Sequence, residues 1–206
     1  MLTALAGESV PQAQVNGLVE EVLPQGCWSD DDYLWLTDHT RRLVEFTDGY
    51  LEILPMPSRG HQRILAYLYS LFYAFVAPSG GEVLFAPLRL RIRPGKFREP
   101  DLLLVRDARD ARSGERFWTG ADVVVEVVSP DNPQRDLVLK RDDYAEAAIP
   151  EYWIVDPATE TLTVLKLEDS GYVEHGVYER GARTGSSALP GFEVDVGDVF
   201  DAAGSE

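Results

Sequence analysis

The sequence is short of cysteine, of long apolar runs and of positive charge, and each shortage excludes a class of protein. Cys27 is the only cysteine among 206 residues, so no internal disulfide can form and a reducing, cytoplasmic environment is expected. Apolar runs such as 123–125 are far shorter than the roughly 20 residues that span a bilayer. The first ten residues lack a charged segment before a hydrophobic stretch, so neither a secretory signal nor a membrane contact is expected.

Several catalytic signatures are also missing. The sequence has no glycine-rich phosphate loop, no G-x-S-x-G elbow and no Cys/His cluster of the kind that binds zinc. These absences argue against a P-loop nucleotide hydrolase, an α/β-hydrolase and a zinc-finger protein.

Positive charge is scarce overall but unevenly distributed. The chain has 35 acidic and 19 basic residues, a formal net charge of −16, which argues against a general nucleic-acid coat because phosphate binding needs cations. Residues 61–141 nevertheless carry thirteen bases against ten acids. Most of these bases lie in one segment, which contains Arg89, Arg91, Arg93, Lys96, Arg98, Arg106, Arg109, Arg112 and Arg116. The segment is interpreted either as a solvated basic edge strand and loop or as a surface that faces phosphate.

The composition is otherwise that of one folded domain. Hydrophobic residues make up 45% and charged residues 26% of the chain, which is too apolar for a disordered protein and sufficient for a core. Residues 1–27 show no clear periodicity and are expected to form a loosely ordered lead-in. Residues 28–200 are expected to form a single domain, and residues 201–206 a tail.

The order of apolar patterns predicts an α/β fold. A short helix is expected after Ser29, and a hairpin over 42–54. The longest helix is predicted over 61–76 and buries one face: His61, Ile64, Leu65, Leu68, Phe72 and Phe75. A second helix is predicted from Asn132 and Pro133 to near Ile149. Strands are predicted at 82–86, 88–92, 100–105, 121–129, 151–156 and 161–167. This order indicates one mixed sheet with helices on both faces and an N-terminal hairpin.

Glu126 is the most unusual residue of the sequence. It is the only charge between Val123 and Val128, in a run that is typical of a buried central strand. A buried lone carboxylate must be paired with a cation, hydrogen-bonded or protonated. A salt bridge to Arg89 or Arg91 is one interpretation, and a metal ligand is the other.

Asp101 is a candidate second ligand. It stands at the head of the predicted strand 101–105. If this strand pairs antiparallel with that of Glu126, in a register that sets Asp101 near Val125, the two acidic residues are close neighbours. Two carboxylates at that spacing can share a hard cation such as magnesium. The alternative is an aspartate that only caps a turn.

Lys140 lies on the predicted helix that follows the strand of Glu126. Leu137, Lys140 or Arg141, Tyr144 and Ala148 form the stripe expected to face the sheet. The Lys140 ammonium either stays at the surface while its stem covers apolar groups or orients water and stabilises charge on a phosphate.

These residues resemble the Uma-type family of putative restriction endonucleases. The resemblance covers about residues 28–200 and rests on the PD pair at 100–101, on Glu126 with a lysine on the next helix, and on three strings, VVVEVVSPD, DLVLKRDDYAEAAIPEYWIVDP and LPGFEV. It implies the PD-(D/E)XK nuclease fold, a restriction-endonuclease-like mixed sheet with an αβββαβ core flanked by helices. It also implies magnesium- or manganese-dependent hydrolysis of DNA.

The resemblance assigns residues to the nuclease motif. Asp101 corresponds to its aspartate and Glu126 to its second acidic position. Val128 stands where the motif usually has lysine, so Lys140 is implied to replace it from the helix.

Glu45 and His61 also match recurrent positions of the family. The resemblance implies that Glu45 is a supporting catalytic residue and metal ligand beside Asp101 and Glu126, and that His61 has a weaker catalytic role. The alternatives are an exposed hairpin carboxylate for Glu45 and a structural histidine for His61.

Two functions remain open from the sequence. The first is a magnesium- or manganese-dependent endonuclease acting on DNA, expected to be a homodimer because cutting both strands commonly needs two sites related by a twofold axis. The tyrosines of the long helix, Tyr67, Tyr69 and Tyr73, or the C-terminal strands would supply the dimer surface. The second is a catalytically inactive module that binds nucleic acid or protein.

Overall fold

The computed structural model describes residues 23–130, 135–169 and 171–204. Most of the expected lead-in, and the predicted helix start at Asn132 and Pro133, therefore lie outside the described residues. None of the helices in these ranges is long and apolar enough to cross a membrane.

The first part of the chain folds around a small sheet of four strands. Its elements are helix α2 (Asp30–His39) and strands β1 (Val44–Thr47), β2 (Tyr50–Ile53), β4 (Leu90–Arg93) and β5 (Lys96–Arg98). The strand order is β2-β1-β5-β4, with antiparallel neighbours. Helix α2 packs on this sheet through its own apolar cluster. The predicted helix after Ser29 is confirmed by the reciprocal capping box between Ser29 and Asp32, and the predicted hairpin is β1 with β2.

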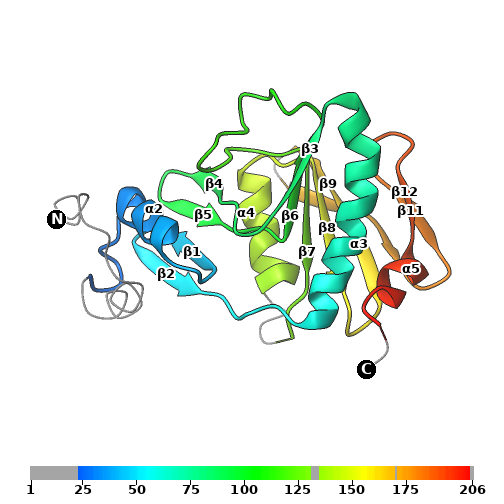
Figure 1. Ribbon diagram of the computed structural model, residues 1–206, viewed down its shortest axis with the longest axis horizontal. Helices are drawn as coiled ribbons and strands as arrows, with labels where there is room; N and C mark the ends of the chain where they lie inside the picture. The colour runs from blue at the N-terminus through cyan, green and yellow to red at the C-terminus, as the bar shows by residue number, and fades with distance from the viewer. Residues whose placement is uncertain (1–22, 131–134, 170, 205–206) are drawn as a thin grey trace.

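A larger sheet of six strands carries the rest of the fold (Figure 1). Its strands are β3 (Glu82–Phe85), β6 (Leu102–Val105), β7 (Val123–Val127), β8 (Glu151–Asp156), β9 (Thr161–Glu168) and β10 (Gly171–Tyr178). The order is β10-β9-β8-β7-β6-β3, in which only β7 and β8 run parallel. Every residue of β7 is buried, which explains its nearly unbroken apolar run.

Helices cover both faces of the large sheet (Figure 1). Helix α3 (Arg59–Val76), followed by a turn of 3-10 helix (Ala77–Ser79), packs on one face. Helix α4 (Lys140–Glu146), preceded by a π-helical turn (Arg135–Leu139), packs on the other. The chain ends in a hairpin of β11 (Arg183–Gly185) and β12 (Glu193–Asp195) with helix α5 (Val196–Asp201), which joins the core on the α3 side.

The predicted strands at 82–92 belong to two different sheets. Strand β4 pairs with β5, a strand that was not predicted from the sequence, through a turn in which Gly95 has a φ of +84°. The hairpin is an insertion between β3 and β6. Without it, α3, β3, β6, β7, α4 and β8 follow the expected αβββαβ order.

Two predictions at helix ends are wrong. Phe75 is 38% exposed, whereas Val76 takes the buried position. The ring of Phe75 contacts Phe192 at the edge of the core instead. Ala148 is exposed because it follows the end of α4 at Glu146 and has a φ of +52°.

Candidate active site at the junction of the two sheets

The carboxylate of Glu126 is buried on β7 and paired with α4. Its residue is 2% exposed. Its Oε1 accepts a hydrogen bond of 2.7 Å from Lys140 Nζ and a second bond from the Tyr144 hydroxyl. The counter-cation is therefore Lys140, and the alternative of a salt bridge to Arg89 or Arg91 is wrong.

Lys140 has its ammonium group inside the protein. The residue is 3% exposed, and Nζ also lies 3.5 Å from Oε1 of Glu45. A lysine that merely covers apolar surface would keep its charge in water, so that interpretation is wrong. One buried cation instead joins carboxylates from the two sheets, Glu126 on β7 and Glu45 on β1.

Tyr144 completes this cluster as a hydrogen-bond donor. Complete burial, together with the negative charge of Glu126, raises the pKa of Tyr144 well above 10. The hydroxyl therefore keeps its proton and donates a hydrogen bond to the carboxylate. Lys140 and Tyr144 lie one turn apart on α4, which is why both reach Glu126.

Glu45 is not the exposed hairpin carboxylate of the alternative interpretation. It is 2% exposed, and its Oε2 lies 3.7 Å from Nε of Arg98. Arg98 in turn donates to Asp143 on α4 at 2.7 Å. Because neighbouring residues of a strand face opposite sides, Phe46 packs under α2 while Glu45 faces α4.

Asp101 lies at the end of β6, close to the position that the sequence predicts. The pairing of β6 and β7 is antiparallel as expected, but Leu102 is opposite Val125. Continuing this register sets Asp101 level with Glu126. The Asp101 carboxylate accepts a hydrogen bond of 2.8 Å from the backbone N–H of Val127 through Oδ2.

His61 holds the same oxygen from the first turn of α3. Its Nε2 lies 3.0 Å from Asp101 Oδ2, and its Nδ1 is buried without a hydrogen-bond partner in the described ranges. The side chains of His61 and Asp101 are 13% and 15% exposed, so solvent reaches this pair but barely reaches Glu126. The two acidic residues are thus held by opposite helices, Asp101 by α3 and Glu126 by α4.

The donor chemistry of Asp101 and Glu126 fits a hard divalent cation. In the described part of the chain, no three His, Cys, Asp or Glu side chains converge to hold a metal ion by themselves. Magnesium needs no such cluster, because it commonly binds one or two carboxylates and completes its shell with water and substrate phosphate. Asp101 and Glu126 have the ligand atoms for that mode, and the binding of one ion by both stays a prediction. Glu45 is engaged by Lys140 and Arg98, and its role as a third ligand stays a prediction.

Glu99 lies in the candidate site but was not predicted as a site residue from the sequence. It is 3% exposed, and its Oε2 accepts a hydrogen bond of 2.9 Å from the backbone N–H of Val44. Burial, and secondarily the charge of Glu45, raises the pKa of Glu99 to about 8. Glu99 and Asp101 both line a cavity of about 430 Å³. The only signal in the sequence was the position of Glu99 two residues before Asp101.

The raised pKa of Glu99 predicts a fall in stability with increasing pH. With its pKa raised to about 8, Glu99 in the folded state is expected to keep its proton to a higher pH than an unfolded glutamate, whose pKa is about 4.3, so between these values the folded state binds more protons. We expect the free energy of unfolding in metal-free buffer to decrease over this window, by at most about 1.4 kcal/mol per pH unit from this group. Denaturation of Glu99→Gln should show a shallower decrease. Identical pH profiles for both proteins would contradict the assignment.

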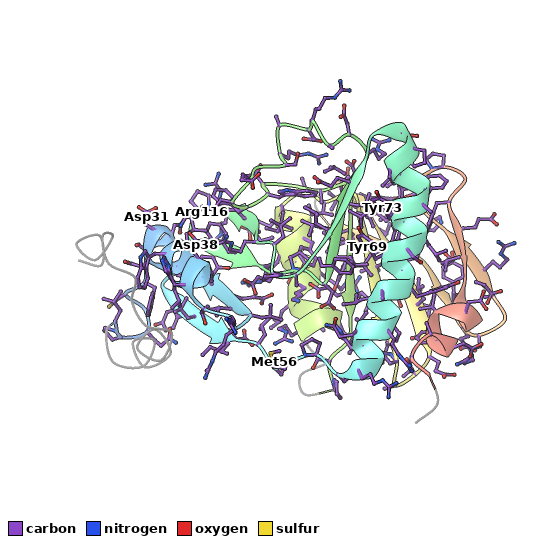
Figure 2. All side chains as sticks on the ribbon, in the orientation of Figure 1. Asp31, Asp38, Met56, Tyr69, Tyr73 and Arg116 are labelled. Carbon is purple, nitrogen blue, oxygen red and sulfur yellow. The ribbon has the colours of Figure 1, made fainter. Side chains whose placement is uncertain are left out.

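The basic segment 89–116 is largely engaged with the protein's own carboxylates. Arg89 and Arg116 both pair with Asp38 on α2, and Figure 2 labels Arg116 and Asp38. The remaining ion pairs join Arg93 to Asp48 and Glu146, Lys96 to Asp143 and Glu146, Arg98 to Glu45 and Asp143, Arg106 to Asp122, Arg109 to Asp107, and Arg112 to Asp110 and Asp122. Arg91 lies over the ring of Phe117. These contacts favour a structural role for the segment over a phosphate-binding surface.

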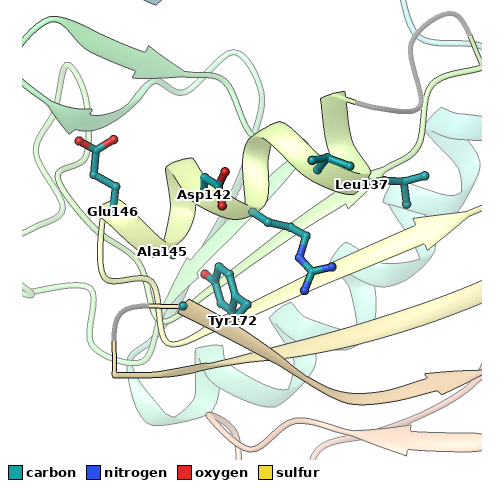
Figure 3. Close-up of a pocket in the computed structure, with 8 residues that line it drawn as sticks. Leu137, Asp142, Ala145, Glu146 and Tyr172 are labelled. Atoms are coloured by element: carbon teal, nitrogen blue, oxygen red, sulfur yellow. The ribbon is translucent and has the colours of Figure 1, made fainter.

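A second cavity lies away from the predicted site. It has a volume of about 520 Å³ and lies beside α4, where Leu137, Asp142 and Tyr172 contribute to its wall (Figure 3). Its lining contains none of the five predicted site residues, whereas the cavity of about 430 Å³ is lined by Asp101. We therefore place the candidate active site at the cavity beside Asp101.

Comparisons with known proteins agree with this fold. Residues 30–197 match the model of a family, Uma2, that is described as "Putative restriction endonuclease". A crystal structure described as a putative nuclease belonging to DUF820, from Anabaena variabilis ATCC 29413, superposes with a TM-score of 0.72 at 21% identity, covering 85% of this chain and 99% of that chain. No curated protein matches the sequence. The structural likeness supports the expected restriction-endonuclease-like α/β fold.

Proposed function

The chain belongs to the Uma2 family of putative restriction endonucleases, and from this membership we propose that it is a divalent-metal-dependent endonuclease that hydrolyses DNA phosphodiester bonds. The observation that carries the proposal is the buried Lys140–Glu126 ion pair beside Asp101. Buried ion pairs often contribute no net stability compared with apolar side chains. A buried ion pair that joins Glu126, the one charged residue of strand β7, to Lys140 on helix α4 therefore supports a functional role.

Asp101 and Glu126 would hold the metal in this proposal. A bound magnesium or manganese ion would polarise the scissile phosphate and activate water. His61 and the backbone N–H of Val127 fix the orientation of Asp101. Lys140 positions Glu126 and keeps positive charge beside it, which supports the view that it replaces the lysine missing at the strand.

The inactive binding module remains the second candidate. The net charge of −16 and the internal ion pairs of the basic segment favour it, because both weaken attraction to a DNA backbone. A homodimer that cuts both strands is part of the first proposal and has no separate support from the contacts within one chain.

A cleavage assay distinguishes the two candidates. Purified protein should convert supercoiled plasmid and end-labelled oligonucleotides to shorter products at low salt with magnesium or manganese, and should not do so in EDTA. Cleavage that is equal in the wild type and in Glu126→Gln would indicate a contaminating nuclease. Binding of DNA without cleavage under any of these conditions would support the inactive module.

A further inference from the structure

The cavity beside Asp101 has the size of a pocket for one small ligand. Its volume of about 430 Å³ falls within the range of roughly 300–1,000 Å³ that is typical of such pockets. A DNA duplex, whose major groove alone is about 12 Å wide, cannot enter it. One nucleotide that has left the duplex could.

Two arginines line this cavity and are available for phosphate. Arg41 and Arg42 follow α2 and are exposed. Neither forms an ion pair with any of the described residues, in contrast to eight of the nine cations of the segment 89–116. The acidic residues of the cavity wall are Glu99, which is buried, and Asp101, which is held by His61. The outer wall is therefore positively charged and complementary to a phosphate.

An aromatic surface continues from the same cavity. Phe85, at the end of the edge strand β3, lines the cavity and is 40% exposed. Tyr69 stacks on Phe85 with ring centroids 4.3 Å apart, and Tyr73 stacks on Tyr69. Figure 2 shows the two tyrosines along α3. Phe85 and Tyr73 are exposed, and Tyr69 between them is half-buried. Accessible rings beside cations are the combination that binds single-stranded nucleic acid, because every base can stack on a ring.

From this juxtaposition we propose that the site prefers a DNA strand with an unpaired nucleotide over intact duplex. Arg41 and Arg42 bind the phosphate, Phe85 stacks against the base, and the adjoining phosphodiester is presented to Asp101. The proposal rests on the proposed nuclease function and names its substrate class. It assigns to DNA two of the three tyrosines, Tyr69 and Tyr73, that were predicted from the sequence to supply a dimer surface.

Fluorescence anisotropy in EDTA tests the preference without cleavage. The probes are a labelled single strand of mixed sequence, the blunt duplex of that sequence, and an abasic strand of equal length. The wild type should bind the single strand more tightly than either of the others. Phe85→Ala should weaken binding of the single strand by about tenfold, the effect of losing one stacked base, and should leave binding of the abasic strand unchanged.

The arginines are tested by salt dependence. Arg41→Ala with Arg42→Ala should weaken binding of the single strand and of the abasic strand, and reduce the slope of log affinity against log salt for both by about 1.4, the value for two phosphate contacts on a single strand. The matched control is Arg106→Ala with Arg109→Ala, which removes equal charge from exposed positions of the basic segment. This control should bind like the wild type, and melting temperatures should verify that all variants are folded.

Three results of the binding assays would overturn the inference. The first is equal affinity of the wild type for duplex and single strand, and the second is equal affinity of the wild type for the abasic strand and the intact single strand. The third is a loss of DNA affinity in the Arg106/Arg109 control as large as in the Arg41/Arg42 variant. Light scattering that shows dissociation of a dimer in Phe85→Ala, with single-strand affinity unchanged, would assign the rings to a second copy. If Phe85→Ala and the wild type cleaved duplex at equal metal-dependent rates, this inference would be refuted but the proposed nuclease function would not. A preference for the single strand without any metal-dependent cleavage would refute the proposed nuclease function and leave the binding preference standing.

Discussion

Lys140→Met is expected to lower the free energy of unfolding by about 3–5 kcal/mol, the usual effect of breaking a buried ion pair. Methionine has a similar length but no charge, so Glu126 and Glu45 would stay buried without the cation that contacts both. Chemical denaturation at constant pH measures the difference.

Two variants control this result. Arg141→Met removes the same charge from the adjacent, partly exposed position of α4 and should change stability by less than about 1 kcal/mol. Combining Lys140→Met with Glu126→Gln should restore part of the lost stability, because the carboxylate charge is then removed as well. If Lys140→Met were as stable as the wild type, the buried ion pair would not be the organising feature of the site.

Asp101→Asn is expected to reduce metal-dependent DNA cleavage by at least about 100-fold, because a metal ion contributes several kcal/mol to stabilising a phosphoryl transition state. The amide keeps the shape of the side chain and an oxygen that can accept from the backbone N–H of Val127. Stability should therefore change little while activity is lost. Asp107→Asn, at an exposed loop position, is the control, and cleavage by Asp101→Asn within a few-fold of the wild type would show that Asp101 does not hold the metal.

The elements with one buried face could be predicted from the sequence because their periodicity is local. Helix α3 and the hairpin of β1 and β2 lie where the apolar pattern and the turn residues place them. The pairing of β6 with β7 was predicted to within one residue, since both strands are short and apolar. Which sheet β4 joins could not be predicted, because its alternating pattern fits the edge of either sheet.

The candidate site was predictable where a residue contradicts its surroundings. Glu126 is a charge within an apolar run, and Lys140 falls on the buried stripe of a helix. The burial of Glu45 and Glu99 depends on contacts between residues far apart in sequence, such as the bond from Val44 to Glu99. The basic segment was misleading for the same reason, since the acids that pair with it, such as Asp38, are distant in the chain.

A calorimetric titration of manganese into the wild type and Glu126→Gln tests the central claim. The claim is that Asp101, next to the start of β6, and Glu126, on the neighbouring strand β7, form a metal site. The wild type should bind the ion, and Glu126→Gln should bind it much more weakly while remaining folded by its melting temperature. A variant that binds manganese as tightly as the wild type would contradict the assignment of the site.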